Sequence, residues 1–212
     1  MSKFFNLDAP VVRFMGKVGE LMIFSTLWLL CCLPFFTVGA ATAALYRLMF
    51  NMKEDRSTKL SDFFRAFKEN FIIGTLLWLI LLAVVAILAV LYWLIAWVES
   101  DLIRLVLLVV FSALFFVAFI GAMYLFPLTA YFENTVGGTL RNAVRMGLGH
   151  LRNSIPACAL ALLPIVARLL SLEFFMRLLF LWLVLAPGAI AYGIVCILWP
   201  VFQKYIPEKT EE

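Results

Sequence analysis

The sequence has few of the residues on which most enzymes depend. Only 14% of its 212 residues are charged, and His150 is the one histidine. A lone histidine cannot build a metal site without ligating neighbours. The chain contains no HExxH, Walker or GxGxxG pattern and no recognisable Ser-His-Asp set. We therefore expect no enzyme, no catalytic or metal-binding residues and no cofactor. Glu133, near Tyr131, is the one carboxylate that could lie in a cavity, although a position at a helix end is favoured.

The sequence also lacks paired cysteines of the kind that form zinc or redox motifs. Cys31 and Cys32 are adjacent and would point in different directions around a helix, which makes them poor disulfide partners. Cys158 and Cys196 lie in apolar stretches as well. All four are expected to serve as small hydrophobic residues in a packed interior.

What the chain has in abundance is apolar sequence. Hydrophobic residues make up 65% of it, against about 45–50% in a typical soluble domain. Several runs exceed the roughly 20 residues that a helix needs to cross the hydrocarbon core of a bilayer. They include Phe71–Val98, Leu102–Pro127 and Leu178–Val201. The composition predicts an all-α, polytopic membrane helical bundle in a single domain, residues 1–212.

The first apolar stretch, Leu21–Phe50, is too long for one membrane helix. As a single helix it would measure about 45 Å, whereas the hydrocarbon core is about 30 Å thick. Pro34 can end a helix because it lacks an amide proton, and Thr37 can cap the next one. The spacing predicts a hairpin over residues 18–51, with helices from 18 to 36 and from 37 to 51. The second helix offers small residues for close packing in lipid, namely Gly39, Ala40, Ala43 and Ala44.

Other segments alternate between interfacial and membrane-spanning patterns. An interfacial segment is predicted over 1–17, an amphipathic helix over 58–70, an amphipathic stretch over 138–153 and a polar tail over 207–212. Within 71–202, membrane helices are expected from 71 to 98, from 102 to 125 (ending at Pro127), from 154 to 170, and from 174 to 202 with a kink at Pro187. A cleaved secretory signal is a disfavoured alternative, because Asp8 and Glu20 interrupt its basic and apolar regions.

The distribution of lysine and arginine indicates an orientation. With six membrane helices, including the short second one, 14 of the 17 cations lie on one side. Only Arg104, Arg168 and Arg177 lie on the other. With five helices the division becomes 11 against 6. Because cations favour the cytoplasmic side, we expect six helices, both termini in the cytoplasm and the amphipathic helices on the cytoplasmic side.

A family resemblance is carried by motifs in the first 80 residues. These are Leu27-Trp28, Leu33-Pro34, Thr37-Val38-Gly39-Ala40-Ala41, Ala44-Leu45-Tyr46, Phe63-Phe64 and Phe67-Lys68-x-Asn70-Phe71, with weaker matches at Pro127 and Leu140-Arg141-Asn142-Ala143. In these motifs the chain resembles the YesL-like family of bacterial integral membrane proteins, a domain of unknown function. Many relatives carry asparagine where this chain has Ser25. The signature residues, for which a structural role is expected, are Trp28, Pro34, Thr37, Gly39, Ala40, Tyr46, Phe64, Phe67 and Asn70.

The resemblance implies a small multi-pass protein of the bacterial cell membrane, often encoded beside carbohydrate uptake systems. We expect a non-enzymatic accessory or assembly partner of such a system. Its partners would be the lipid bilayer and another membrane protein such as a sugar permease, with no nucleic acid. The alternative is a small transporter for a neutral solute such as a sugar, because helices broken at Pro34, Pro164 and Pro187 can line a cavity. An intramembrane enzyme would need a catalytic pair that the sequence does not offer.

Overall fold

The structure, a computed structural model, describes residues 10–133 and 135–205, and every regular element in these ranges is helical. The all-α prediction is therefore confirmed. Residues 1–9 of the predicted interfacial segment and the predicted polar tail lie outside the described residues. In chain order the elements are α1 (Pro10–Cys31), η1 (Phe35–Thr37), α2 (Val38–Lys53), α3 (Leu60–Glu69), α4 (Phe71–Ala96), α5 (Asp101–Tyr131), α6 (Val136–Gly149), α7 (Leu151–Leu170), α8 (Leu172–Arg177), α9 (Leu179–Val184) and α10 (Ala186–Gln203).

Four described helices are long and apolar enough to cross a membrane: α4, α5, α7 and α10. The chain is therefore consistent with a membrane protein. The two helices of the N-terminal hairpin are not among the four. With 16 residues, α2 measures about 24 Å, and α1 carries Lys17 and Glu20 in its first half. A count of six membrane helices stays a prediction.

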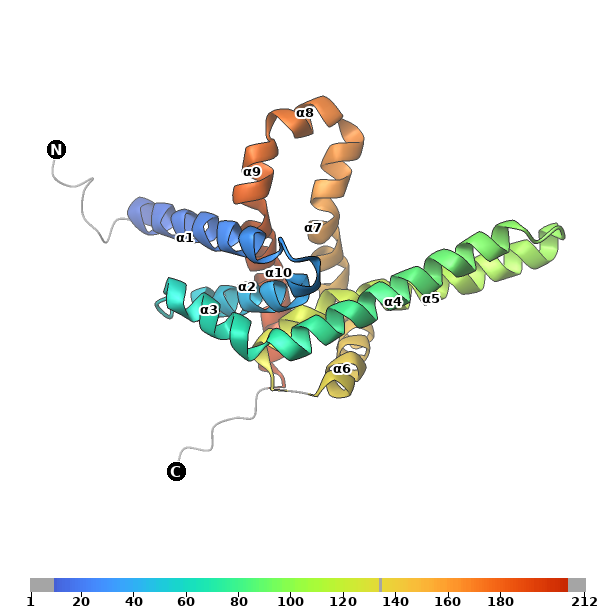
Figure 1. Ribbon diagram of the computed structural model, residues 1–212, viewed down its shortest axis with the longest axis horizontal. Helices are drawn as coiled ribbons and strands as arrows, with labels where there is room; N and C mark the ends of the chain where they lie inside the picture. Colours follow the sequence, from blue (N-terminus) through green and yellow to red (C-terminus); the bar gives the residue numbers. More distant parts are fainter. Residues whose placement is uncertain (1–9, 134, 206–212) are drawn as a thin grey trace.

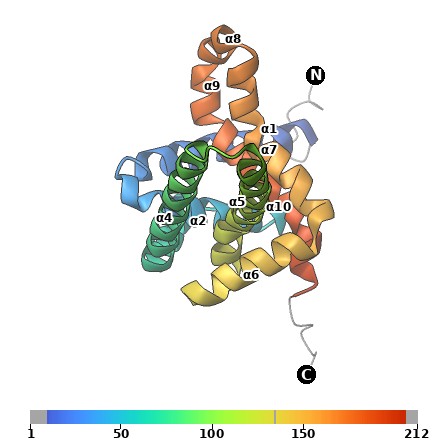
Figure 2. The same cartoon turned by 90° about the vertical axis from the view of Figure 1, so that its right-hand side faces the viewer.

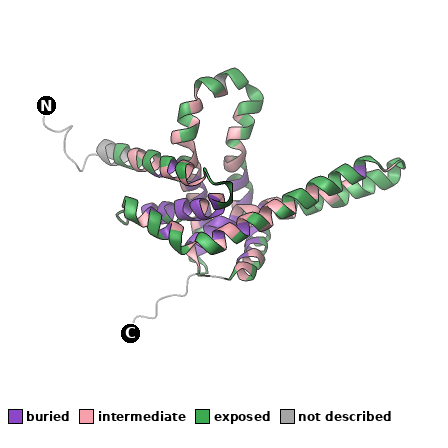
Figure 3. Ribbon diagram, in the orientation of Figure 1, coloured by how far each residue is buried: buried purple, intermediate pink, exposed green. Residues whose placement is uncertain are grey.

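The short helix α2 forms the centre of the molecule. Eleven of its sixteen residues are buried, and α1, α3, α4, α5 and α10 all pack against it. Its small residues make this possible, since Ala40, Ala43 and Ala44 are completely covered. Figure 3 shows buried residues gathered on α2 and on the parts of its neighbours that meet it. A helix that is not among the four candidate membrane spans thus organises the core.

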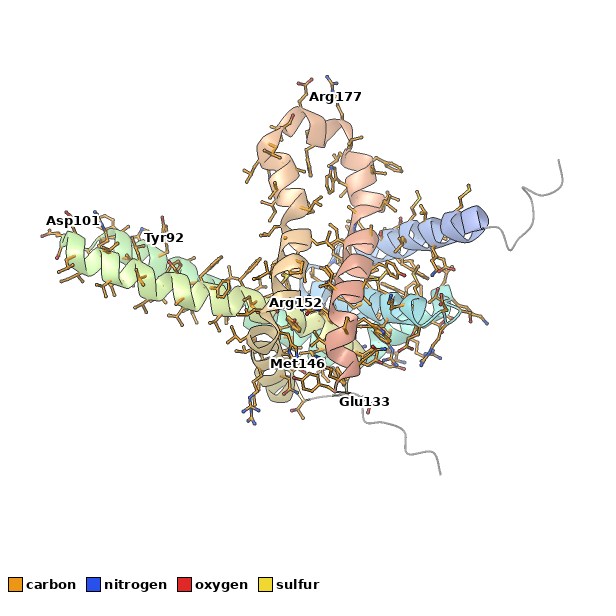
Figure 4. All side chains as sticks on the ribbon, turned by 180° about the vertical axis from the view of Figure 1, so that it is seen from behind. Tyr92, Asp101, Glu133, Met146, Arg152 and Arg177 are labelled. Carbon is orange, nitrogen blue, oxygen red and sulfur yellow. The ribbon has the colours of Figure 1, made fainter. Side chains whose placement is uncertain are left out.

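Two long arms leave this core in different directions. The α4–α5 hairpin projects to the right in Figure 1, and Figure 2 shows it end-on. The second arm is an arch formed by α7, α8, α9 and α10, and it rises to the top of both views. Asp101 marks the tip of the hairpin and Arg177 the tip of the arch in Figure 4. Both tips carry ion pairs within one helical turn, Arg104 with Asp101 and Arg177 with Glu173.

The N-terminal hairpin exists, but its turn differs from the prediction. The first helix ends at Cys31 and not at residue 36, and Thr37 does not cap α2. The Thr37 backbone has helical dihedrals (φ −88°, ψ −5°), whereas a capping residue adopts an extended backbone. Its hydroxyl instead bonds backward, 2.5 Å from the Cys31 carbonyl oxygen and 2.6 Å from that of Pro34. Thr37 therefore satisfies the Cys31 carbonyl group at the end of α1 and adds a second hydrogen bond to the Pro34 carbonyl group, which already accepts from the Thr37 backbone amide.

The prediction for Pro127 was wrong, whereas the predicted kink at Pro187 has a counterpart in a helix break at Leu185. Helix α5 does not end at Pro127 but continues to Tyr131. Two residues further on, the Thr129 hydroxyl donates to the Leu125 carbonyl oxygen at 2.8 Å, a side-chain contact typical of proline-containing membrane helices. The expected helix over 174–202 is divided into α8, α9 and α10, with breaks at Leu178 and Leu185. Pro187 lies in the first turn of α10, where its missing amide proton costs no hydrogen bond.

Candidate functional site

Several of the sequence-predicted signature residues lie on α2 or pack against it, and the structure places α2 at the junction of both arms. Trp28 on α1 donates its indole N–H to the Thr42 hydroxyl of α2 at 3.1 Å. Gly39 and Ala40 lie against Gly74 of α4. Tyr46 is 8% exposed. These side chains from α1 and α2 are therefore brought together as packing elements.

The turn that contains Pro34 is attached to α4 by an aromatic residue. The Trp78 indole N–H donates to the Phe35 carbonyl oxygen at 2.9 Å. The two rings meet edge to face with centroids 5.7 Å apart. Pro34 supplies a carbonyl to Thr37, as described above. Trp78 thus fixes the position of the α1–α2 turn against the base of the α4–α5 hairpin.

The remaining signature residues lie around α3. Phe67 is half-buried and packs edge to face on Phe71, with centroids 5.6 Å apart. Phe64 is 52% exposed and is not part of the cluster around α2. Asn70 joins α3 to α4, and its side-chain amide donates to the Ala66 carbonyl oxygen at 2.9 Å. Asn70 also borders a polar cavity.

This polar cavity, of about 520 Å³, lies where α2, the α3–α4 junction and the end of α5 meet. It is the principal candidate site, because charged, amide and hydroxyl groups from separate elements converge on it. Figure 4 shows Glu133 at the base of the molecule, far from both arm tips. The polar lining residues are Arg47, Glu69, Asn70, Thr129, Tyr131, Glu133 and Thr135.

Arg47 is the cation of the cavity. Its guanidinium donates to the Ala130 carbonyl oxygen at 2.9 Å, near the end of α5. No carboxylate of the described residues lies within ion-pair distance of it. Helix ends leave carbonyl groups without intrahelical partners and carry partial negative charge, so a cation stabilises this end of α5.

Next to it, Tyr131 donates its hydroxyl to the Glu54 carboxylate at 3.1 Å, and Glu54 pairs with Arg56 at 2.8 Å. For Glu133 the sequence favours a position at a helix end over a position in a cavity. The structure combines the two, because Glu133 lines the cavity just beyond the end of α5. Sequence reasoning missed Arg47 as a cavity residue, since its charge was assigned to the general cytoplasmic excess.

The cavity suits a polar solute better than a metal ion. It offers a guanidinium, an amide, hydroxyls and two carboxylates from separate elements. The described residues contain no group of three or more His, Cys, Asp or Glu side chains that could hold a metal. Hydrogen-bond donors and acceptors around a concave space are what a small polar ligand requires.

Buried and half-buried polar contacts hold the arch together and attach it to the rest of the molecule. The Gly188 amide on α10 donates to the Ser25 hydroxyl of α1 at 2.8 Å. Asn153 on α7 donates to the Ile197 carbonyl oxygen of α10 at 2.7 Å. Tyr124 on α5 and Ser154 on α7 are hydrogen-bonded at 2.9 Å. Each contact joins two helices in surroundings where an unpaired polar group is costly.

A second set of contacts holds α1 beside the α2–α3 linker. The Lys17 ammonium donates to the Asp55 carboxylate at 3.2 Å, and this hydrogen bond raises the pKa of Lys17 above its ordinary value. One turn along α1, Glu20 accepts a hydrogen bond from Thr58 at 3.2 Å. The linker therefore holds the first half of α1 in place through polar contacts.

The architecture defines an all-helical protein with four helices able to span a membrane. Residues 21–92 match the model of a family described as "Protein of unknown function, DUF624". The matched range runs from the middle of α1 through most of α4 and contains all nine signature residues. No curated protein and no solved structure matches the chain.

Proposed function

We propose that the protein is a non-enzymatic, multi-pass accessory or assembly partner of a carbohydrate uptake system in the bacterial cell membrane, of the YesL-like type. The observation that supports this most directly is the α4–α5 hairpin. Its apolar residues leave the core and are exposed over most of their length (Figure 3). Val90 and Val109, near the middle of the arm, are 56% and 63% exposed. An apolar surface of this extent calls for lipid or for another membrane protein.

The proposed orientation places both termini in the cytoplasm and both arm tips outside. At 31 residues, α5 is about 46 Å long and exceeds a hydrocarbon core of about 30 Å. A helix that is too long is accommodated by tilting. Two arms that diverge from one core and cross the same bilayer must also be tilted, so the excess length agrees with their different directions.

The assembly role is tested by site-directed photo-crosslinking in native membranes. A photoreactive amino acid at Val90 or Val109 should yield a defined adduct with a membrane transport protein. The same group at Ser57, in the polar linker, serves as the matched control outside the arm. Lipid adducts alone at both arm positions would refute the proposal.

A second function, binding or transport of a neutral solute such as a sugar, is favoured by the polar cavity. Its volume of about 520 Å³ falls within the range of small-ligand sites. Carboxylates, an amide and a guanidinium can bond the hydroxyl groups of a sugar, each of which donates and accepts. Sugar flux into liposomes that contain this protein alone, reduced by Arg47→Gln, would support this function over the first. Absence of flux and of saturable sugar binding would exclude it.

A further inference from the structure

A second cavity differs from the polar one in its chemistry, because most of its lining residues are apolar. It measures about 380 Å³, is open on one side and is lined by residues of α1, α2, α7, α9 and α10 together with Phe175 of α8. Its walls are aromatic and aliphatic, with contributions from Trp28, Phe175, Trp182, Pro164 and Pro187. Two of the enclosing helices, α7 and α10, are candidate membrane spans. We name this space the Tyr46 cavity after one of the polar residues that line it.

Tyr46 brings a hydroxyl to a cavity that is otherwise mostly apolar. Its side chain belongs to a residue that is only 8% exposed, at the centre of the most buried helix. Among the described residues its hydroxyl has no hydrogen-bond partner, although it lines the cavity. A tyrosine hydroxyl in largely apolar surroundings usually finds a partner, because leaving one unpaired costs free energy.

The neighbouring polar groups cannot fill this role. The Thr42 hydroxyl, also on the cavity wall, already accepts from Trp28 at 3.1 Å and donates to the Val38 carbonyl oxygen at 2.6 Å. On the α9 side, the Trp182 indole nitrogen is buried and has no partner among the described residues. The cavity thus combines apolar walls with the Tyr46 hydroxyl, a donor that the described residues leave unpaired, and it is bordered by Trp182, whose covered indole nitrogen is also unpaired.

We propose that the Tyr46 cavity binds a membrane lipid, with an acyl chain among the aromatic and proline side chains and the ester carbonyl oxygen accepting a hydrogen bond from Tyr46. The volume lies in the range of small-ligand sites, which are mostly apolar with a few placed polar groups. The bilayer presents such molecules directly to the spaces between membrane helices. An ester carbonyl accepts hydrogen bonds and donates none, which suits a site that offers donors. This assignment is independent of the assembly role proposed above.

The test uses the full-length protein in phosphatidylcholine nanodiscs that contain one of two photoreactive probes. One is a phosphatidylcholine with a diazirine in its acyl chain, and the other is a diazirine-labelled alkane without oxygen. Adducts are mapped by mass spectrometry on Tyr46 and on residues 179–191, with the exposed α4–α5 arm as the internal reference for general lipid contact. One hydrogen bond corresponds to a preference of roughly two- to tenfold. We expect the cavity to favour the ester probe by that factor relative to the arm.

Tyr46→Phe should abolish the preference while leaving adducts on the arm unchanged. The matched control is Tyr92→Phe, which removes the same hydroxyl from a residue 59% exposed on the arm. Because the Tyr46 hydroxyl has no protein partner, Tyr46→Phe should keep the wild-type Tm in lipid-depleted detergent. A second variant, Ile190→Trp, fills the cavity from a half-buried position and should remove cavity adducts of both probes. Cavity labelling no higher than on the arm, or an ester preference that survives Tyr46→Phe, would overturn the assignment.

Discussion

Gly39 on α2 and Gly74 on α4 pack backbone against backbone. A Cβ added at Gly39 would overlap the Gly74 carbonyl oxygen and lie 2.7 Å from the Trp78 Cβ. A Cβ added at Gly74 would lie 2.8 Å from the Cα of Ala40. No side chain larger than hydrogen fits at either position without moving a helix. This contact holds the α4–α5 hairpin against the core.

Gly39→Leu and Ala43→Leu should damage folding more than His150→Ala. Ala43 is completely buried, and overpacking of this kind costs about 1–3 kcal/mol or more. His150 contacts Tyr205 edge to face at 5.9 Å, near the end of the described chain. The thermal midpoint of each variant in detergent is the measurement, with equal midpoints for all three as the contradicting result.

Thr37→Val should destabilise the α1–α2 turn. It removes the hydroxyl that bonds the Cys31 and Pro34 carbonyl oxygens, at a cost of about 1–2 kcal/mol in total. Thr26→Val is the matched control, since Thr26 bonds back to Met22 on an exposed face within α1. Chemical denaturation in mixed micelles should rank Thr37→Val clearly below Thr26→Val. The idea fails if the two variants unfold together.

Ser25→Ala should loosen the arch. It leaves the buried Gly188 amide without its acceptor, which costs about 1–3 kcal/mol. Ser112→Ala removes a hydroxyl that bonds only within its own exposed helix and should have little effect. Hydrogen exchange at the start of α10 is the sharpest readout, because faster exchange is expected there for Ser25→Ala alone. Unchanged protection would show that the link contributes nothing.

Arg47→Met should weaken the junction between α2 and the end of α5. The variant loses the donor to the Ala130 carbonyl oxygen, and because Arg47 is itself exposed, the loss should cost about 1.5 kcal/mol, the lower end for a charged donor. Arg56→Met removes an arginine that is 68% exposed, where an ion pair contributes about 0–1 kcal/mol. A comparison of the two thermal midpoints checks the difference, and a larger loss for Arg56→Met would contradict it.

Impermeant cysteine labelling tests the proposed orientation. In a background without the four native cysteines, a cysteine at Ser100 or Glu173, near the two arm tips, should react from outside intact cells. A cysteine at Ser57, in the α2–α3 linker, should react only after the membrane is opened. External reaction at Ser57 would reject a cytoplasmic position of the α2–α3 linker.

The amino-acid sequence by itself determined the helical class, the membrane-spanning character and the break near Pro34. These follow from composition, from run length and from the missing amide of proline, which are local properties. The small-residue face of α2 was also predictable, because Gly39 and its alanines recur at helical spacing. Its partner Gly74 was not, since nothing in a single apolar run tells which glycine another helix will meet.

Only the tertiary structure decided how the polar groups pair. Thr37 carries the residue type of an N-cap, but the course of the chain places its hydroxyl on the carbonyl groups behind it. Pro127 lies inside a helix because long-range packing outweighs a local preference for ending one. Arg47 reaches a carbonyl 83 positions away along the chain, and Tyr46 is left without a partner beside a cavity. Such relationships depend on which helices meet, and long-range contacts of this kind leave no periodic trace in the sequence.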